Sequence, residues 1–390
     1  MAAGERSNDF WAVAAYALVA AASQLLWLTF APITTESAAQ YGVSEDSIGL
    51  LAEIFPLLYV LLAIPAGLLL DRHLERTLVA AAGLMAFGAA VRLGGSYAAA
   101  LAGQVLIAIA QPAVLAAITK LAAERVAPES RATAIGIGSA GMFLGLVGAL
   151  ILGATIGADD ELQPLLIVNL LIALAAFAAI GLALRRPASF ETGERAAIGL
   201  RELRAIYTDP VLSRLGVMMF LGVGVFNALA TWLEVLLEPA GFSSSTTGWI
   251  LVGTTVAGVA GAIALPPHVA KRGAERGFMQ LVGLAGAAVF ALLAAIDAVP
   301  LVFSLLAGLG FVLLAGQPVI LEISARRAGD AAASAAGAVQ LAANLGGIVI
   351  AVLIQTVNDD STLSFALLGV LMLAIAPVAR SLRSGFAEPI

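Results

Sequence analysis

The sequence predicts an all-α membrane protein with 12 transmembrane helices, arranged as two six-helix bundles related by pseudo-twofold symmetry. Composition is the first reason. Of the 390 residues, 61% are hydrophobic and only 12% are charged, with a mean hydropathy of +1.00, whereas soluble domains carry about 25% charged residues. The second reason is a series of long apolar runs between polar breaks, and the third is a Gln-Pro pair that occurs in both halves of the chain.

The apolar runs are long enough to cross about 30 Å of hydrocarbon as helices. Helices are expected because lipid offers no partners to backbone polar groups, and the residue alternation of a strand barrel is absent from the sequence. The first run is too long for a signal-peptide core, so we expect it to remain as a span. The twelve runs are residues 11–34, 47–70, 77–95, 98–119, 131–155, 164–184, 213–237, 246–267, 277–296, 299–321, 333–357 and 362–380.

Lysine and arginine predict the orientation of these helices. The two tails, the connections after even-numbered runs and the run ends that border them hold 19 of the 20 basic residues, and Arg92, late in the third run, is the exception. The odd-numbered connections carry acidic residues such as Asp159 and Asp360 instead. Because basic residues favour the cytoplasmic side, we expect a multi-pass protein of the plasma membrane with both termini in the cytoplasm.

A charged connection divides the chain into the two predicted bundles. Residues 1–184 are expected to form the N-terminal six-helix bundle, residues 185–212 a cytoplasmic linker, and residues 213–390 the C-terminal six-helix bundle. The linker is partly amphipathic, and a short surface helix is expected around Leu200–Ile206.

The two predicted bundles repeat one another. Gln111-Pro112 lies in the fourth run and Gln317-Pro318 in the tenth, and each is followed by a basic loop and a Gly/Ala-rich run. Six plus six spans in the same orientation are typical of parallel-repeat transporters, and the arrangement resembles the major facilitator fold. A proline inside a helix bends it and frees a carbonyl. The neighbouring glutamine either faces an aqueous cavity or bonds across a helix interface.

Polar side chains form single stripes on otherwise apolar helices. Gln24 and Trp27 are i, i+3 neighbours, and Gln340 and Asn344 are i, i+4 neighbours. An unpaired amide costs several kcal/mol in lipid, so the stripes should point inward, where they either line a solute site or bond a neighbouring helix for about 0.6 kcal/mol each. The mid-span indole of Trp27 offers its face to a cation. The predicted substrate-binding residues are Gln24, Trp27, Gln111, Asn227, Gln317, Gln340 and Asn344.

Carboxylates inside a membrane are candidates for function. Glu53 and Glu234 are candidate proton-coupling groups, with structural pairing as the alternative, and Arg92 is an expected partner for Glu53. Glu322 lies near the cytoplasmic end of its helix, where we group it with the gating residues and expect Arg326, at i+4, to pair with it.

The loop GLLLDRHLERT, residues 67 to 77, contains Asp71, Arg72 and Arg76. Its pattern G-x-x-x-D-R-x-x-x-R resembles the loop signature of the major facilitator superfamily. The resemblance implies a gating role, in which the acid and the bases lock the cytoplasmic ends of helices together when the protein opens outward.

The sequence also excludes several classes of function. It has no cysteine, and its two histidines, His73 and His268, lie in polar loops, so neither a metal site nor a cofactor is predicted. No nucleophile–base pair or HExxH motif suggests an enzyme, and the net charge of −6 argues against nucleic acid. The expected partners are a small-molecule solute, the lipid bilayer and, if transport is coupled, protons. We expect a monomer.

The first half of the chain resembles the feline leukaemia virus subgroup C receptor-related branch of this superfamily. The matching stretches are QYGVSEDSIGLLAEIFPLLYVLLAIPAGLLLDRHLERT, GAAVRLGGS and AGQVLIAIAQPAVLAA, with weaker matches in VILEIS and AGAVQLAANLGGI. The resemblance implies transport of choline or ethanolamine, earlier linked to haem. It places Trp27 under the quaternary ammonium and Gln111 at the hydroxyl. Asn227 stands where the branch has a tyrosine and Asn344 where it has a glutamine, so a smaller or more hydrogen-bonding solute is the alternative.

These observations predict a membrane transporter that moves a small organic solute, an amine or choline-like cation, by alternating access. It is expected to be either a uniporter or proton-coupled. Two other functions stay open on the same sequence. One is a proton-driven exporter of drugs or metabolites, and the other is a membrane receptor that transports nothing.

Overall fold

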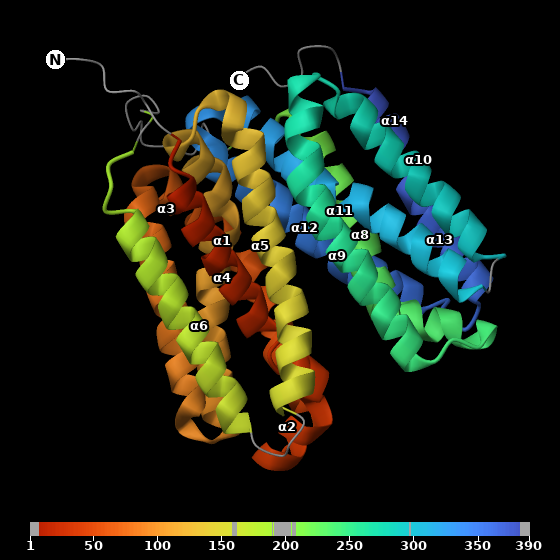
Figure 1. The fold of residues 1–390 in the computed structure, drawn as a ribbon, viewed down its shortest axis with the longest axis horizontal. Coiled ribbons are helices and arrows are strands. Elements are labelled where there is room, and N and C mark those ends of the chain that lie inside the picture. Colours follow the sequence, from red (N-terminus) through yellow and green to blue (C-terminus); the bar gives the residue numbers. More distant parts are fainter. Residues whose placement is uncertain are drawn as a thin grey trace. The chain divides into compact units, whose positions relative to one another are not determined.

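The computed structural model describes residues 8–157, 162–188, 190, 204, 208–295 and 298–382. Within these ranges every regular element is helical (Figure 1), as the sequence predicts. The surface helix expected around Leu200–Ile206 and the acidic connection at Asp159 lie outside the described residues.

The first half of the chain contains five long helices and several short ones. The first long helix of this half holds one predicted span, and α3 holds two. The elements are α1 (Phe10–Trp27), η1 (Ala31–Ile33), α2 (Thr34–Tyr41), α3 (Glu45–Val91), η2 (Arg92–Gly94), α4 (Tyr97–Arg125), η3 (Pro128–Ser130), α5 (Arg131–Leu152), η4 (Gly153–Gly157) and α6 (Leu162–Ala183).

The second half follows a similar plan. Its elements are α8 (Pro210–Leu237), η5 (Glu238–Ala240), α9 (Ser244–Lys271), α10 (Glu275–Leu293), α11 (Val299–Ala328), η6 (Gly329–Ala331), α12 (Ala332–Gln355), α13 (Ser361–Leu373) and α14 (Ile375–Arg380).

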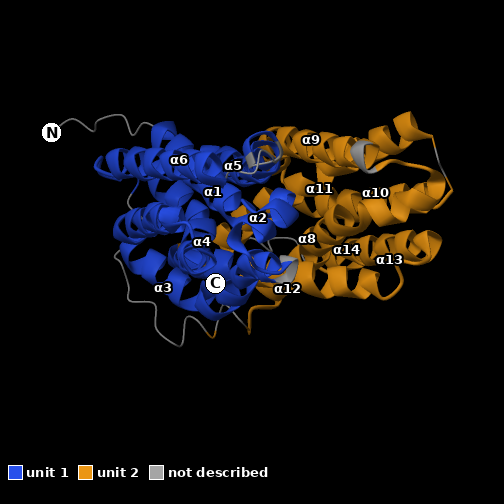
Figure 2. Cartoon of the chain, turned by 90° about the horizontal axis from the view of Figure 1, so that it is seen from below, with its two compact units in different colours: residues 1–199, 330–337 blue, residues 200–329, 338–390 orange. Residues whose placement is uncertain are grey.

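The chain forms two compact units, shown in different colours in Figure 2. Unit 1 comprises residues 1–199 and 330–337, and unit 2 comprises residues 200–329 and 338–390. The segment 330–337 follows the linker in sequence yet belongs to unit 1, so the first turn of α12 is part of the first unit. The bundle and linker boundaries that we expect from the sequence stay predictions.

Ten described segments are long and apolar enough to cross a membrane. Two of them, Ser47–Gly94 with 48 residues and Val299–Gln355 with 57 residues, each contain two of the predicted spans. Each of the twelve runs therefore lies at least partly in a described helix. Inside α3 the two spans are separated at His73, whose backbone (φ −144°, ψ 59°) is not helical.

Two predicted spans are not continuous helices. The first was expected over 11–34, but α1 ends at Trp27, and the chain passes through η1, which contains Pro32, before α2 begins. The last was expected over 362–380, but it is broken between α13 and α14, three residues before Pro377. Proline lacks the N–H that a continuous helix needs and clashes with the preceding turn.

Glycines allow one pair of helices in each unit to pack closely. A Cβ on Gly145 of α5 would lie 2.8 Å from Cα of Ala21 in α1, so only glycine fits there. In unit 2, a Cβ on Gly224 of α8 would lie 2.7 Å from the carbonyl oxygen of Gly346 in α12. The first and fifth spans of each half are thus in backbone contact, which is the small-residue packing common between membrane helices.

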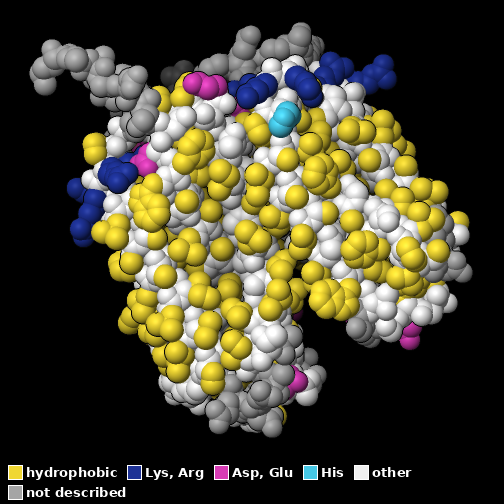
Figure 3. Space-filling view, in the orientation of Figure 1, with side chains coloured by type: hydrophobic (Ala, Val, Ile, Leu, Met, Phe, Trp, Pro, Cys, Tyr) yellow, Lys and Arg dark blue, Asp and Glu magenta, His cyan; other side chains and the backbone are white. Residues whose placement is uncertain are grey.

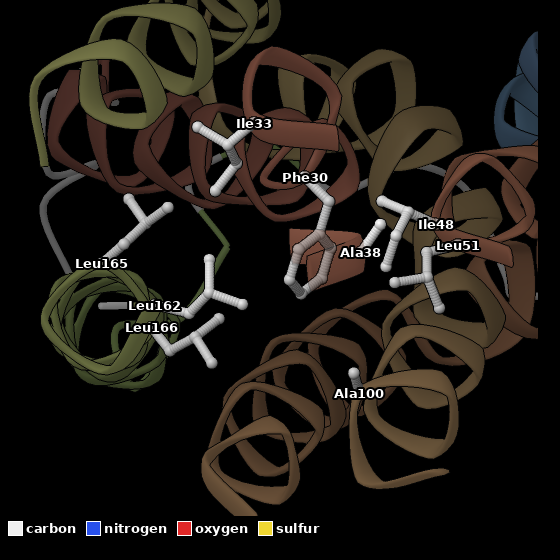
Figure 4. Close-up of a cluster of buried hydrophobic side chains, with 9 residues drawn as sticks. All are labelled: Phe30, Ile33, Ala38, Ile48, Leu51, Ala100, Leu162, Leu165 and Leu166. Atoms are coloured by element: carbon white, nitrogen blue, oxygen red, sulfur yellow. The ribbon is translucent and has the colours of Figure 1, made fainter. Parts of the chain in front are cut away.

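Unit 1 also has a hydrophobic cluster where α2 and the end of α1 meet the helices around them (Figure 4). Burial of these side chains fixes α2 and η1 against α3, α4 and α6. The members are Phe30, Ile33, Ala38, Ile48, Leu51, Ala100, Leu162, Leu165 and Leu166.

The sides of both units are hydrophobic on the surface. Leu61 and Phe87 of unit 1 are 64% and 61% exposed, and Trp249 of unit 2 is 70% exposed. Figure 3 shows hydrophobic side chains over the sides of each unit, with Lys and Arg gathered toward one end. Such extended apolar faces match the lipid-facing surface of a membrane protein.

Candidate functional site

The two Gln-Pro pairs occupy corresponding helices. Gln111 and Pro112 lie inside α4, and Gln317 and Pro318 lie inside α11. Both glutamines are buried, at 3% and 7% exposed. Because proline has no backbone N–H, each of these two helices lacks one backbone donor beside its buried glutamine.

In unit 1, two buried amides lack a protein partner. Gln24 of α1 and Gln111 of α4 are each 3% exposed, and the Nε2 atom of each has no hydrogen-bond partner among the described residues. The two helices pack together, and Tyr16 Oη of α1 donates to Val114 O of α4 at 2.9 Å. A buried donor without an acceptor costs about 1–3 kcal/mol. An oxygen atom supplied by a ligand or by water would remove that cost.

Trp27 ends α1, one turn after Gln24, and is half-buried. Its Nε1 donates to Ala52 O of α3 at 2.9 Å, and its ring centroid lies 6.0 Å from that of Phe55. The indole is therefore held in one orientation by its own N–H group. The face of its partly exposed ring takes no part in this hydrogen bond, so it is available to a cation.

In unit 2, the predicted residues of α8 and α12 lie together. A Cβ on Gly347 would lie 2.5 Å from Nδ2 of Asn227, so the Asn227 amide packs directly on α12. Asn344, one turn before Gly347, donates its Nδ2 to Gln340 O at 2.9 Å, and Gln340 is 3% exposed. Asn344 Nδ2 thus bonds a backbone oxygen of its own helix.

The two candidate coupling carboxylates, Glu53 of α3 and Glu234 of α8, are both exposed. The expected pairing of Glu53 with Arg92 is wrong. Arg92 is fully buried, and its Nη1 donates to Leu26 O, Thr29 Oγ1 and Gln104 Oε1, at 3.2, 3.2 and 3.1 Å. Position along a span cannot predict such a pairing, because it does not tell which way a side chain points around the helix.

The buried arginine is the centre of a polar network that we did not predict. Its guanidinium carbon lies 5.7 Å from the centroid of Phe30. Asn169 of α6 donates Nδ2 to Thr29 Oγ1 at 2.9 Å, and Gln104 Nε2 donates to Leu51 O at 3.2 Å. The network joins α3, α4 and α6 to the end of α1. The sequence feature that could have indicated this network is Arg92 itself, a basic residue on the side of the membrane where Lys and Arg are otherwise absent.

Asp71 is the most completely bonded of the predicted gating residues. It is 3% exposed, and its two carboxylate oxygens accept the N–H groups of Ala333 and Ser334, both at 2.9 Å, and the Ser334 hydroxyl. Ala333 and Ser334 are in the first turn of α12, where N–H groups have no partner within the helix. A side chain of α3 therefore caps α12, and we name this contact the Asp71 cap.

Three further residues hold the same turn of α12 in place within unit 1. Thr119 Oγ1 donates to Ala332 O at 3.0 Å, and Lys120 Nζ donates to the backbone oxygen of Asp71 at 2.8 Å. A Cβ on Gly67 would lie 2.8 Å from Cα of Ser334, so only glycine allows this approach. Sequence reasoning counted Lys120 only as a loop charge and missed its contact.

The remaining predicted gating residues lie on α3 and α11. Arg72 and Arg76 are exposed on α3. Glu322 is buried, and its Oε1 lies 2.9 Å from Arg326 Nε, which confirms the predicted i, i+4 ion pair. Arg326 also pairs with Glu275 of α10 at 2.6 Å.

Unit 1 has its own ion-pair cluster around Arg125, at the end of α4. Arg125 is fully buried, and its Nη2 donates to Glu75 of α3 at 2.7 Å. Its Nη1 lies 3.7 Å from Asp9, which also caps α1 through Ala12 N. The first, third and fourth spans are therefore tied together at one end of the unit.

Unit 2 repeats this arrangement. Asp209 caps α8 through the N–H groups of Val211 and Leu212 and pairs with Arg327 Nη2 at 2.7 Å. Burial by itself would raise the pKa of the Asp209 carboxyl, but the hydrogen bonds from Arg327 and from the Leu212 N–H outweigh it and hold the pKa below its usual value. In both units, an aspartate that caps the first helix meets an arginine that follows the Gln-Pro pair.

Among the described residues, no group of three or more His, Asp or Glu side chains is arranged to hold a metal ion. The polar groups of each unit instead lie inside an apolar helix bundle. Together with the repeated helix plan, they define a multi-pass membrane transporter built from two repeats.

The chain belongs to the Major Facilitator Superfamily, whose profile matches residues 11–351. It is therefore a membrane transporter and not an enzyme.

The known relatives agree with this family. The chain is 29% identical over 281 residues to solute carrier family 49 member A3 of Danio rerio, an alignment that covers 68% of this chain and 59% of that protein. The chain thus spans about three fifths of this relative's length. It also superposes on the human organic anion transporter MFSD10 with a TM-score of 0.79 at 18% identity, covering 95% and 99% of the two chains. It superposes on the fucose:proton symporter FucP of E. coli with a TM-score of 0.78 at 15% identity, covering 95% of this chain and 97% of FucP.

Proposed function

We propose that this chain transports a small organic amine of the choline kind across the plasma membrane by alternating access. The observation that carries the proposal is the pair of buried Nε2 groups on Gln24 and Gln111, which lack acceptors among the described residues. Gln24 lies one turn before Trp27 in α1, and Gln111 lies in α4, which packs against α1. An amino alcohol has both groups that these three side chains would bind. Its cation fits an aromatic face, and its hydroxyl oxygen accepts hydrogen bonds from amide donors.

In unit 2, the residues proposed to bind solute are Asn227, Gln317, Gln340 and Asn344. All four are neutral and polar, so they add hydrogen bonds without adding charge. The match to solute carrier family 49 supports the resemblance to the feline leukaemia virus subgroup C receptor-related branch. In the proposed cycle, the Asp71 cap forms and breaks as the two ends of the site open in turn.

A thermal-shift screen of purified protein against amines, sugars, amino acids and drugs, followed by uptake into liposomes, tests the solute class. Choline-like amines should stabilise the wild type, and Trp27→Ala should weaken their binding by about 2- to 30-fold, the range expected for a cation–π contact. Gln111→Leu should weaken binding of amino alcohols more than that of amines without a hydroxyl.

Trp232→Ala is the matched control. Like Trp27, Trp232 donates its indole N–H to a backbone oxygen, that of Ala351 at 3.0 Å, so both variants lose the same kind of structural bond. If the two variants bind amines equally well, Trp27 is not part of the site. If only sugars or organic anions stabilise the protein, the proposed solute class is wrong.

An imposed pH gradient separates the two energetic mechanisms. If uptake follows the gradient, Glu53→Gln or Glu234→Gln should flatten its pH dependence, since each variant removes a titratable group at a candidate position. Uptake that does not change with the imposed pH gradient indicates a uniporter.

A further inference from the structure

An open groove lies between α3 and α6 on unit 1, a short distance along α3 from the Asp71 cap. Its volume is 510 Å³. Val79 and Phe177 contribute to an apolar floor. Arg76, three residues after the His73 break in α3, and Arg185, two residues after the end of α6, also line the groove. The groove belongs to neither the proposed solute site nor the polar network around Arg92.

Two glycines keep the groove open. A Cβ on Gly83 of α3 would lie 3.2 Å from the ring of Phe177, and a Cβ on Gly181 of α6 would meet no atom within 4 Å. Neighbouring side chains indicate that this part of the unit faces lipid. Phe87 and Leu182, on the same two helices, are 61% and 55% exposed, as side chains in contact with lipid tails are.

The charge of the groove is positive. Arg76 and Arg185 are both exposed, and neither has an ion-pair partner within the described part of the chain. Glu75 also lines the groove and is bonded to the buried Arg125 at 2.7 Å, so the charged lining residues are one carboxylate, held in an ion pair, and two arginines. Two guanidinium groups therefore stand free beside an apolar floor.

We propose that this groove binds an anionic phospholipid of the surrounding membrane, with its phosphate between Arg76 and Arg185 and an acyl chain along Val79 and Phe177. Arginine binds phosphate oxygens through pairs of N–H donors. Basic pockets between membrane helices on the cytoplasmic side are suited to acidic head groups, and the orientation predicted from Lys and Arg puts this end of unit 1 there. A lipid with a choline head group would place its quaternary ammonium cation close to the two arginines, which carry the same charge.

Native mass spectrometry of the purified chain tests the proposal. The protein is titrated with phosphatidylglycerol or with phosphatidylcholine of identical acyl chains, and bound lipids are counted. The wild type should retain phosphatidylglycerol in preference to phosphatidylcholine. Arg76→Gln/Arg185→Gln should lower that preference by about 25-fold, since each basic residue near an anionic head group contributes about fivefold.

Gly181→Leu tests the apolar part separately, because it fills the groove and keeps both arginines. It should lose one bound lipid, and the open space at Gly181 means that it should fold. The controls lie in unit 2. Arg272→Gln/Arg276→Gln removes two exposed cations, and Gly277→Leu adds a side chain where a Cβ also meets nothing within 4 Å.

The proposal is overturned if the double arginine variant keeps the wild-type preference, or if its loss is matched by the control arginine pair. It is also overturned if Gly181→Leu binds as many lipids as Gly277→Leu. Displacement of the lipid by inorganic phosphate would identify a simple anion site without an acyl chain and would equally reject it. Should the double variant unfold, Arg185→Gln alone carries the test, because Arg185 lies beyond the end of α6 and its side chain has no described hydrogen bond or ion pair.

Discussion

The carboxylate of Asp71 accepts the backbone N–H and the hydroxyl of Ser334, a residue 263 positions later in the chain. Its other oxygen accepts the N–H of Ala333 at 2.9 Å. A negative charge at a helix N-terminus is favourable by up to about 2 kcal/mol in a partly buried setting. The contact is thus strong enough to bias a conformational equilibrium and weak enough to be broken in each transport cycle.

Asp71→Asn should slow transport. The variant keeps the shape of the side chain but removes its charge, and its amide can accept with only one oxygen. Uptake into liposomes should fall, while the affinity for solute, measured by thermal shift, should stay close to that of the wild type. Ser334→Ala is the milder control because it keeps both backbone donors. Wild-type uptake by Asp71→Asn would exclude the Asp71 cap from the transport cycle.

Gly67→Ala should have the same effect, because Gly67 lies in α3 one turn before Asp71 and faces the same turn of α12. The added Cβ would lie 2.8 Å from Cα of Ser334, so the first turn of α12 has to move away from α3. Gly49→Ala, in the same helix, is the matched control, since a Cβ there meets no atom within 4 Å. Equal uptake by the two variants would show that the close approach of α12 is not needed.

Arg92→Met should lower the melting temperature in detergent. The substitution leaves Gln104 Oε1, Thr29 and Leu26 O without their charged donor, and a hydrogen bond to a charged group is worth about 1.5–3 kcal/mol. Arg92→Lys should lose less, because it keeps the charge but not the planar fork. If Arg92→Met melts at or above the wild-type temperature, the buried arginine does not stabilise unit 1.

Asp209 should make stability depend on pH in the acidic range. Its pKa in the folded protein is lowered, with burial opposing and the Arg327 and Leu212 hydrogen bonds favouring the charged form. The stabilisation is therefore fully present above the unfolded pKa, about 3.9 for Asp, and is lost as the pH falls through the lower folded value. Asp209→Asn should be less stable than the wild type at pH 7.

The measurement is thermal unfolding of both proteins in detergent from neutral pH to about pH 3. The gap between the wild type and Asp209→Asn should close as the pH falls, because the wild type loses the same ion pair on protonation. A gap that stays constant would mean that the Arg327 contact does not depend on the charge of Asp209.

Local patterns predicted much of the fold, and they did so where one segment carries the whole signal. Apolar length located the helices, and the spacing of Glu322 and Arg326 predicted an ion pair that forms within one helix. Pro32 and Pro377 also carried a signal for the broken first and last spans, since proline interrupts helices.

The long-range contacts could not be predicted in this way. Nothing local to Asp71 indicates that its partners lie at Ala333 and Ser334, because hydropathy has no information about which helix ends meet. The same limit explains the wrong partner for Arg92. Gln24 and Gln111 could be proposed from their stripes, but only the three-dimensional packing identifies their Nε2 atoms as buried without acceptors.

The assignment of residues 330–337 to unit 1 has a consequence for biosynthesis. A ribosome that has finished residue 199 has not yet made the peptide groups that Asp71 caps. At about 5–20 residues per second, roughly 7–28 s pass before residue 337 is added. Throughout that interval the Asp71 carboxylate of the nascent first unit lacks its final hydrogen-bond donors. The translocation machinery or water at the membrane surface must solvate it until α12 is made.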